Sequence, residues 1–162
     1  MPLPSELIER LADAGARREL GRVLDRLASE RAPVEHGEWF PTLTQSGAVA
    51  ATVDYAWYTL VGRFALVQAR LVVTGSGVAG NSVIVGGQPS ALRPRRSGAI
   101  ATLGVFTLFD ASVALYVGSV EAVAAQAWRL TAHNQGDYVG ITPNFGLANT
   151  DVLGFACVYE RE

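Results

Sequence analysis

The sequence predicts a mainly β protein, an antiparallel β-sandwich of jelly-roll-like type with a short N-terminal helical segment. Charge is distributed unevenly, since residues 1–38 hold 14 of the 28 charged side chains and none of the 14 aromatic ones. From residue 39 onward, short runs rich in Val, Thr and aromatic residues alternate between apolar and polar positions. Turn-forming Gly, Pro, Asn and Asp separate these runs, which is typical of antiparallel strands.

Residues 1–38 are expected to form a helical anchor followed by a linker. Pro4 and Ser5 suit the start of a helix. The positions expected to anchor the segment or to join copies follow at helical spacing: Leu7, Leu11, Leu20, Val23, Leu24 and Leu27. A short charged helix with so narrow an apolar stripe is marginal alone in water. We therefore expect a partner surface, either in an oligomerising collar or docking peg or by folding back onto the β domain.

Residues 39–162 are expected to form the β-sandwich domain. Gln68 and Arg70 occupy one face of the run 64–74, which indicates an antiparallel strand with one solvated face. Residues 121–130 have some helical propensity, but Trp128 and its neighbours favour a strand. The candidate strands are 52–60, 64–74, 81–85, 99–109, 112–120, 124–132 and 151–159.

Residues 75–80 read GSGVAG and match the dinucleotide fingerprint G-x-G-x-x-G. That fingerprint requires a helix directly after the glycines, because the helix N-terminus holds the pyrophosphate. Here a short β-branched run follows, so we interpret the glycines as the connection between two antiparallel strands, 64–74 and 81–85. The remote alternative is an NADP-binding enzyme in which Arg95 and Arg96 contact the 2′-phosphate.

Composition bears on partners and location. The net charge of −2 offers no basic field for nucleic acid. No apolar run is long enough to insert into a membrane, and the first residues lack a signal-peptide pattern. We expect synthesis in the cytoplasm, with a chain that starts at Met1. Cys157 is the single cysteine and shares alternate positions with Leu153 and Phe155, which indicates a buried thiol.

No catalytic, cofactor-binding or metal-binding set is recognisable, so we predict a protein that is not an enzyme. His36 in the linker and His133 in a loop are interpreted as solvated residues, and no metal-ligand spacing occurs. The basic run Arg93–Arg96 is interpreted as a solvated connection in preference to a contact with an acidic partner. An alternative function is a carbohydrate-binding module, with exposed aromatic and loop residues as receptor or glycan contacts: Trp57, His133, Asn134, Asp137, Tyr138, Asn144 and Asn149.

Three motifs carry a resemblance to a known group of proteins. They are WFPTLT at residues 39–44, AWYTLVGR at 56–63, and the alternating VQARL at 67–71 with its TGSG turn at 74–77. In this order they resemble the β-domain of minor tail, tail-fibre and capsid decoration proteins of tailed bacteriophages, which read W-x-P-T-L-T, then Y-x-x-V-G-x-x-V, then an alternating strand. The resemblance covers about residues 39–90, and the later strands are similar in style only.

The resemblance implies a non-enzymatic virion structural protein. Such a domain is a trimeric β-sandwich displayed on the virion, attached to capsid or tail proteins by an N-terminal helical segment, with host-surface attachment as a further role. It brings no catalytic residues to this chain. A trimer would also bury apolar strand faces, which suits a mean hydropathy of +0.23. Head decoration, spike and tail-fibre placements all stay open.

Overall fold

The computed structural model describes residues 21–22, 33–95, 101–111, 114–124, 127–133 and 137–162. Residues Val34–Glu162 form one compact unit. All six residues predicted to anchor the N-terminal segment lie outside the described residues. Residues 21–22 are helical. In the part of the chain that the structure describes, no helix is both long and apolar enough to cross a membrane.

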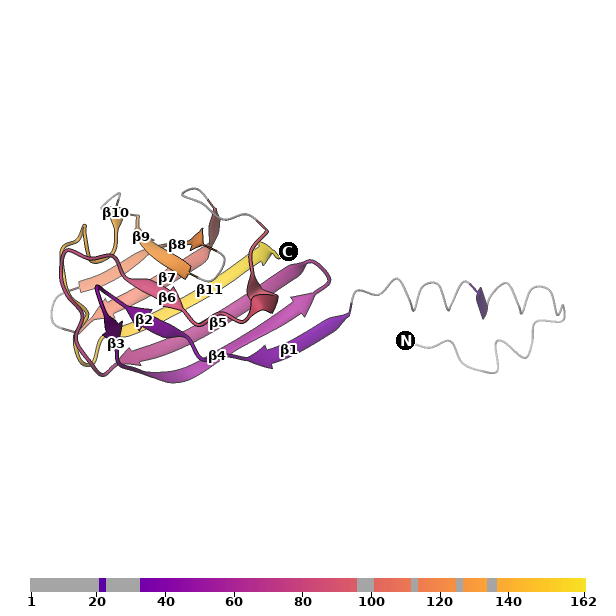
Figure 1. Ribbon diagram of the computed structural model, residues 1–162, viewed down its shortest axis with the longest axis horizontal. Helices are drawn as coiled ribbons and strands as arrows, with labels where there is room; N and C mark the ends of the chain where they lie inside the picture. The colour runs from indigo at the N-terminus through magenta and orange to yellow at the C-terminus, as the bar shows by residue number, and fades with distance from the viewer. Residues whose placement is uncertain (1–20, 23–32, 96–100, 112–113, 125–126, 134–136) are drawn as a thin grey trace. The chain divides into compact units, whose positions relative to one another are not determined.

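The compact unit is a single antiparallel sheet that curls over on itself (Figure 1). Its strands hydrogen-bond in the order β1-β4-β5-β11-β7-β8-β9-β6-β2-β3, and β10 pairs with β9. A short 3-10 helix, η1 (Ser90–Leu92), follows β6. The strands are β1 (Val34–Glu38), β2 (Thr42–Thr44), β3 (Ala48–Val49), β4 (Ala51–Val61), β5 (Phe64–Val73), β6 (Ile84–Gly86), β7 (Thr102–Asp110), β8 (Ala114–Ala124), β9 (Ala127–Ala132), β10 (Asp137–Tyr138) and β11 (Val152–Glu160).

The predicted fold class is confirmed: the described chain is mainly β and antiparallel. The predicted strands 52–60, 64–74, 99–109, 112–120 and 151–159 correspond to β4, β5, β7, β8 and β11. The predicted strand 124–132 corresponds to β9, which begins at Ala127, whereas Ala124 ends β8. Residues 34–38, placed in the linker by the sequence, form β1 and pair with β4.

An aromatic cluster fills the interior and shows how far the sheet curls. Trp128 on β9 contacts Phe155 and Tyr159 on β11, with ring centroids 5.9 Å apart in both pairs. Trp39, in the link between β1 and β2, completes the cluster at 5.8 Å from Trp128. Because β7 and β8 separate β9 from β11 in the sheet, these contacts require the sheet to fold over itself. The apolar face of each strand thereby leaves water.

The connection at residues 75–80 does not join two paired strands, which corrects the expectation from the sequence. β5 pairs with β4 and β11, whereas β6 pairs with β2 and β9. The glycine-rich loop therefore crosses from one part of the curled sheet to another. No helix begins at Val78, and Gly80 adopts a positive φ of 81°, a conformation that glycine allows.

Candidate functional site

One face of the strands β1, β4, β5, β11, β7 and β8 points away from the aromatic interior, and we call it the outer face. Register partners in an antiparallel pair project to the same side, so the pairings of these strands identify its members. The outer face carries these exposed large apolar side chains: Val34, Tyr55, Trp57, Val61, Phe64, Leu66, Val105, Phe109, Leu115, Val117 and Val158.

Most of these side chains gather at two places on the outer face. The first, here called the β4–β5 cluster, contains Val34, Val61, Phe64, Leu66 and Val158. Val61 is opposite both Val34 and Phe64 in the register, and Leu66 is opposite Val158.

The second group, here called the β7–β8 cluster, contains Val105, Phe109, Leu115 and Val117. Phe109 is opposite Leu115, with exposed fractions of 51% and 59%. Polar or small residues on β5, β7 and β11 lie between the two groups: Gln68, Arg70, Thr107, Gly154 and Ala156.

Several charged groups on and beside the outer face are paired within the chain. Arg70 forms an ion pair with Asp54 across the β4–β5 ladder. Glu160 accepts from Arg63 at 2.6 Å and from Arg95 at 2.7 Å. The outer face therefore presents apolar groups together with charges that already have partners of opposite sign.

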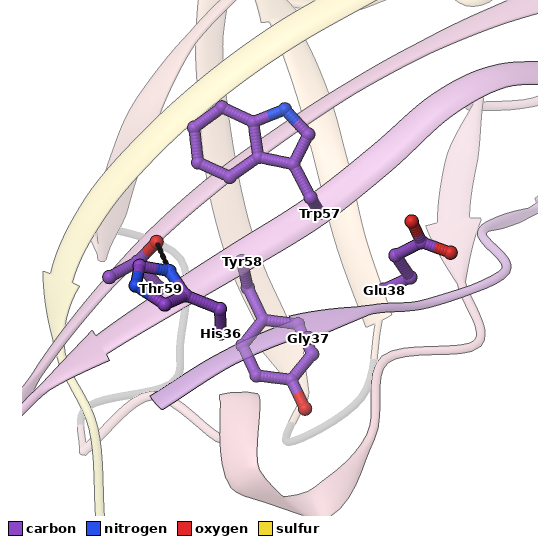
Figure 2. A pocket seen from close by; sticks show the side chains of 6 residues that line it. All are labelled: His36, Gly37, Glu38, Trp57, Tyr58 and Thr59. Atoms are coloured by element: carbon purple, nitrogen blue, oxygen red, sulfur yellow. Dashed lines mark hydrogen bonds between the residues drawn. The ribbon is translucent and has the colours of Figure 1, made fainter. Parts of the chain in front are cut away.

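An open hollow lies on the outer face where β1 meets β4 (Figure 2). Its volume is about 580 Å³, and its walls come from His36, Gly37, Glu38, Trp57, Tyr58 and Thr59. His36 Nδ1 and Thr59 Oγ1 hydrogen-bond each other at 2.8 Å. The indole of Trp57 stands on the opposite side of β4 from the Tyr58 ring, as Figure 2 shows.

Gly37 leaves room for the Tyr58 ring, which lies directly against it. A β-carbon at residue 37 would be 2.3 Å from Tyr58 Cζ, so the ring would have to move aside to accept it. The glycine thus lets the ring pack across the edge strand.

The structure does not bring the predicted glycan contacts together. Trp57 lies on β4, and four strands separate it along the sheet from β9 and its following loop. His133, Asn144 and Asn149 are exposed in loops, and Asn134 lies outside the described residues.

Two further members of that predicted set have local partners. The Asp137 carboxylate accepts from the Tyr138 backbone N–H at 2.7 Å and from Thr142 Oγ1 at 3.3 Å. The Arg129 guanidinium lies 4.0 Å from the centroid of the Tyr138 ring. The Asp137 carboxylate therefore stabilises its own turn, and one face of the Tyr138 ring is covered by a cation.

Other sequence expectations are located as follows. Arg93 pairs with Glu162 at 3.3 Å and Arg95 with Glu160, so this basic run meets acids at the end of β11 and just beyond it, while Arg96 lies outside the described residues. Cys157 is buried, as expected, and burial raises the pKa of its thiol to about 12. The pKa of Tyr116 is also raised, chiefly by burial and further by the Asp110 and Asp151 carboxylates.

Among the described residues, no three His, Cys, Asp or Glu side chains lie close enough together to hold a metal ion.

No family model matches the chain, and no curated protein or solved structure matches it either. The resemblance to phage β-domains therefore depends on the motifs at residues 39–44, 56–63 and 67–77. In the structure these motifs supply the buried Trp39 and the β4–β5 hairpin. That hairpin contributes Trp57, Val61, Phe64 and Leu66 to the outer face.

Proposed function

We propose that this protein is a non-enzymatic virion structural protein, of head decoration, spike or tail-fibre type, that functions as a homo-oligomer. The observation that carries the proposal is the apolar outer face. Clusters of exposed apolar side chains mark interaction surfaces on soluble proteins. A homo-oligomer, a trimer as the motif resemblance implies, would remove the two clusters from water. In this proposal, the N-terminal segment attaches the assembly to other capsid or tail proteins.

The outer face is a better contact surface than the sheet edge. β1 is an edge strand, since its only partner among the described strands is β4. It carries Glu35 and Glu38, both exposed. Charged residues on an edge strand oppose the addition of a further strand, because two such edges would repel. Association through the face avoids this repulsion.

The mass of the full chain in solution tests the proposal. Sedimentation velocity at micromolar concentration should show an oligomer. Leu66→Asp should shift it to monomer, because the carboxylate would have to be buried in the β4–β5 cluster. The matched control is Val78→Asp, at a residue 54% exposed in the glycine-rich loop, which should leave the oligomer intact. A wild-type chain that stays monomeric would contradict the proposal.

The virion assignment needs a separate observation. Capsid or tail genes next to the gene for this chain would support it, and they would also separate head from tail placement. Detection of the chain in purified particles by mass spectrometry would test it directly. A gene surrounded only by metabolic genes, with no chain in any particle, would exclude the virion role and leave the oligomer to be explained in another way.

A further inference from the structure

We propose that the hollow beside Trp57 receives the β7–β8 cluster of a second copy of this chain. The inference rests on the proposed function, since it names the two surfaces that meet when copies associate. One surface is concave and lies at β1 and β4. The other projects from β7 and β8 of the neighbouring copy.

The shapes of the two surfaces are complementary. The hollow is an open volume of about 580 Å³. It lies between two pairs of opposite residues on β1 and β4, which are His36 with Thr59 and Glu38 with Trp57. Phe109 and Leu115 are opposite each other on adjacent strands, so their side chains project together from one spot. Both are more than half exposed in the isolated chain. A paired projection of this kind can enter a hollow that a flat face could not fill.

The chemistry of the hollow favours an apolar occupant. Trp57 offers a large apolar surface at one wall, and tryptophan is the residue type most enriched where binding energy concentrates. His36 Nδ1 and Thr59 Oγ1 already satisfy each other through their hydrogen bond. An apolar side chain can therefore displace water from the hollow without leaving these two atoms unpaired. Glu38, the last residue of the edge strand β1, is exposed in the isolated chain and lines the hollow beside Trp57.

A second copy fits the extent and the charge of the outer face. Six strands at about 4.8 Å spacing, with about eight residues of rise along β5, give a face of roughly 24 by 27 Å. That area is comparable with the roughly 800 Å² per partner of a stable protein interface. Arg70 is paired with Asp54, and Glu160 with both Arg63 and Arg95, so these five side chains leave a net charge of only +1. The face thus requires no charged partner and suits an identical apolar surface.

The two surfaces lie on different strands, which limits the symmetry to two arrangements. The hollow lies at β1 and β4, and the cluster at β7 and β8, with β5 and β11 between them. A contact between unlike surfaces of identical copies is heterologous, and it closes into a ring when the rotation allows. If two copies each place their β7–β8 cluster in the other's hollow, they form a face-to-face pair. Either arrangement brings residue 36 of one copy close to residue 115 of another.

Disulfide trapping tests the contact in the full chain, which keeps its buried Cys157. His36→Cys and Leu115→Cys are prepared separately with distinguishable tags, mixed, allowed to exchange subunits and then oxidised. We expect a disulfide between the two different variants, identified by mass spectrometry of the linked peptides, and little product when either variant is oxidised alone. Efficient self-linking of either variant, or an oligomeric mixture without the mixed product, would overturn the inference.

Affinity measurements give an independent test. Trp57→Ala and Leu115→Asp should each lower the affinity of self-association by about tenfold or more. In the double variant the affinity should fall by less than the product of the two single reductions, because both changes remove the same contact. Ile141→Asp is the control at an exposed residue outside the outer face, and it should associate normally. A wild-type monomer would contradict the proposed function itself. An oligomer that Leu115→Asp leaves intact, or a wild-type chain whose hollow binds a glycan through Trp57, would contradict only this inference.

Discussion

The side chain of Gln45 occupies the space that a β-carbon at residue 77 would need. An ideal β-carbon on Gly77 would lie 1.9 Å from Gln45 Oε1. Gln45 is buried, and its amide donates to the backbone carbonyls of Asn81 at 3.0 Å and Phe145 at 2.8 Å. Its Oε1 accepts from the Leu147 backbone N–H at 2.8 Å. Gly77, the second glycine of GSGVAG, therefore leaves room for Gln45, which links its own turn to Asn81 and to residues 145–147. This packing explains the glycine without a bound cofactor.

Replacement of Gln45 by Ala should be strongly destabilising. The change would leave a buried backbone N–H and two part-buried carbonyls without their partner, and a fully buried group of this kind costs about 1–3 kcal/mol. We expect the free energy of unfolding to fall by roughly 2–4 kcal/mol, because water would satisfy part of the loss. Urea denaturation followed by tryptophan fluorescence measures it. Gln68→Ala, at an exposed position, is the control and should change stability by less than about 0.5 kcal/mol.

Gly77→Ala should destabilise the fold for the same reason, by pushing Gln45 away from its partners. We expect a loss of about 1–3 kcal/mol for the single variant. In a Gln45→Ala background the obstructing amide is absent, so the added cost of Gly77→Ala should largely disappear. A double-mutant cycle of unfolding free energies measures this coupling. Additive effects of the two changes would show that Gly77 is needed for another reason.

The strands could be predicted from the sequence, whereas their partners could not. A half-buried strand must alternate with a period of two, and this pattern located β4, β5 and β11. Pairing, in contrast, depends on contacts between residues far apart in the chain. Val85 pairs with Leu43 and Trp128, 42 and 43 residues away, and the local sequence of β6 contains no sign of this.

The apolar outer face could not be recognised from the sequence, because the side chains on both faces of β5 are largely apolar. Gln68 and Arg70 made one set look solvated, but Phe64 and Leu66 belong to that same set. β1 was missed because Glu35 and Glu38 resemble a solvated linker. Edge strands tolerate such charges, so composition alone does not separate an edge strand from a linker. The hollow beside Trp57 could not be predicted without β1.

Asp151 should also be essential to stability, through two backbone groups that it holds. Its Oδ1 accepts from the Ala111 N–H at 3.1 Å and its Oδ2 from the Ala148 N–H at 2.8 Å, with the side chain buried. An asparagine can accept only one of these bonds, and its NH₂ group would face the other N–H. Asp151→Asn should therefore cost about 1–3 kcal/mol in urea denaturation. Asp54→Asn, which removes a solvated ion pair with Arg70, should cost less than about 1 kcal/mol, and equal effects of the two variants would contradict this account.

Burial of Cys157 should make the fold less stable at alkaline pH. The pKa of its thiol rises from 9.0 to about 12 in the folded chain, because the low-dielectric interior disfavours the thiolate. Above pH 9 the unfolded chain loses this proton and the folded chain keeps it, so unfolding becomes more favourable as pH increases toward about 12. The loss is up to roughly 1.4 kcal/mol per pH unit.

Unfolding free energies measured across this range for the wild type and for Cys157→Ala check the effect. Tyr159, whose pKa is also raised by burial, changes stability in the same direction and stays in both chains. The slope against pH should therefore be smaller, but not zero, in Cys157→Ala. In the native chain a thiol reagent should react with Cys157 only after denaturant is added, whereas the exposed thiol of Val78→Cys should react at once. Rapid labelling of the native wild type, or equal slopes in the two chains, would show that the thiol is accessible to solvent.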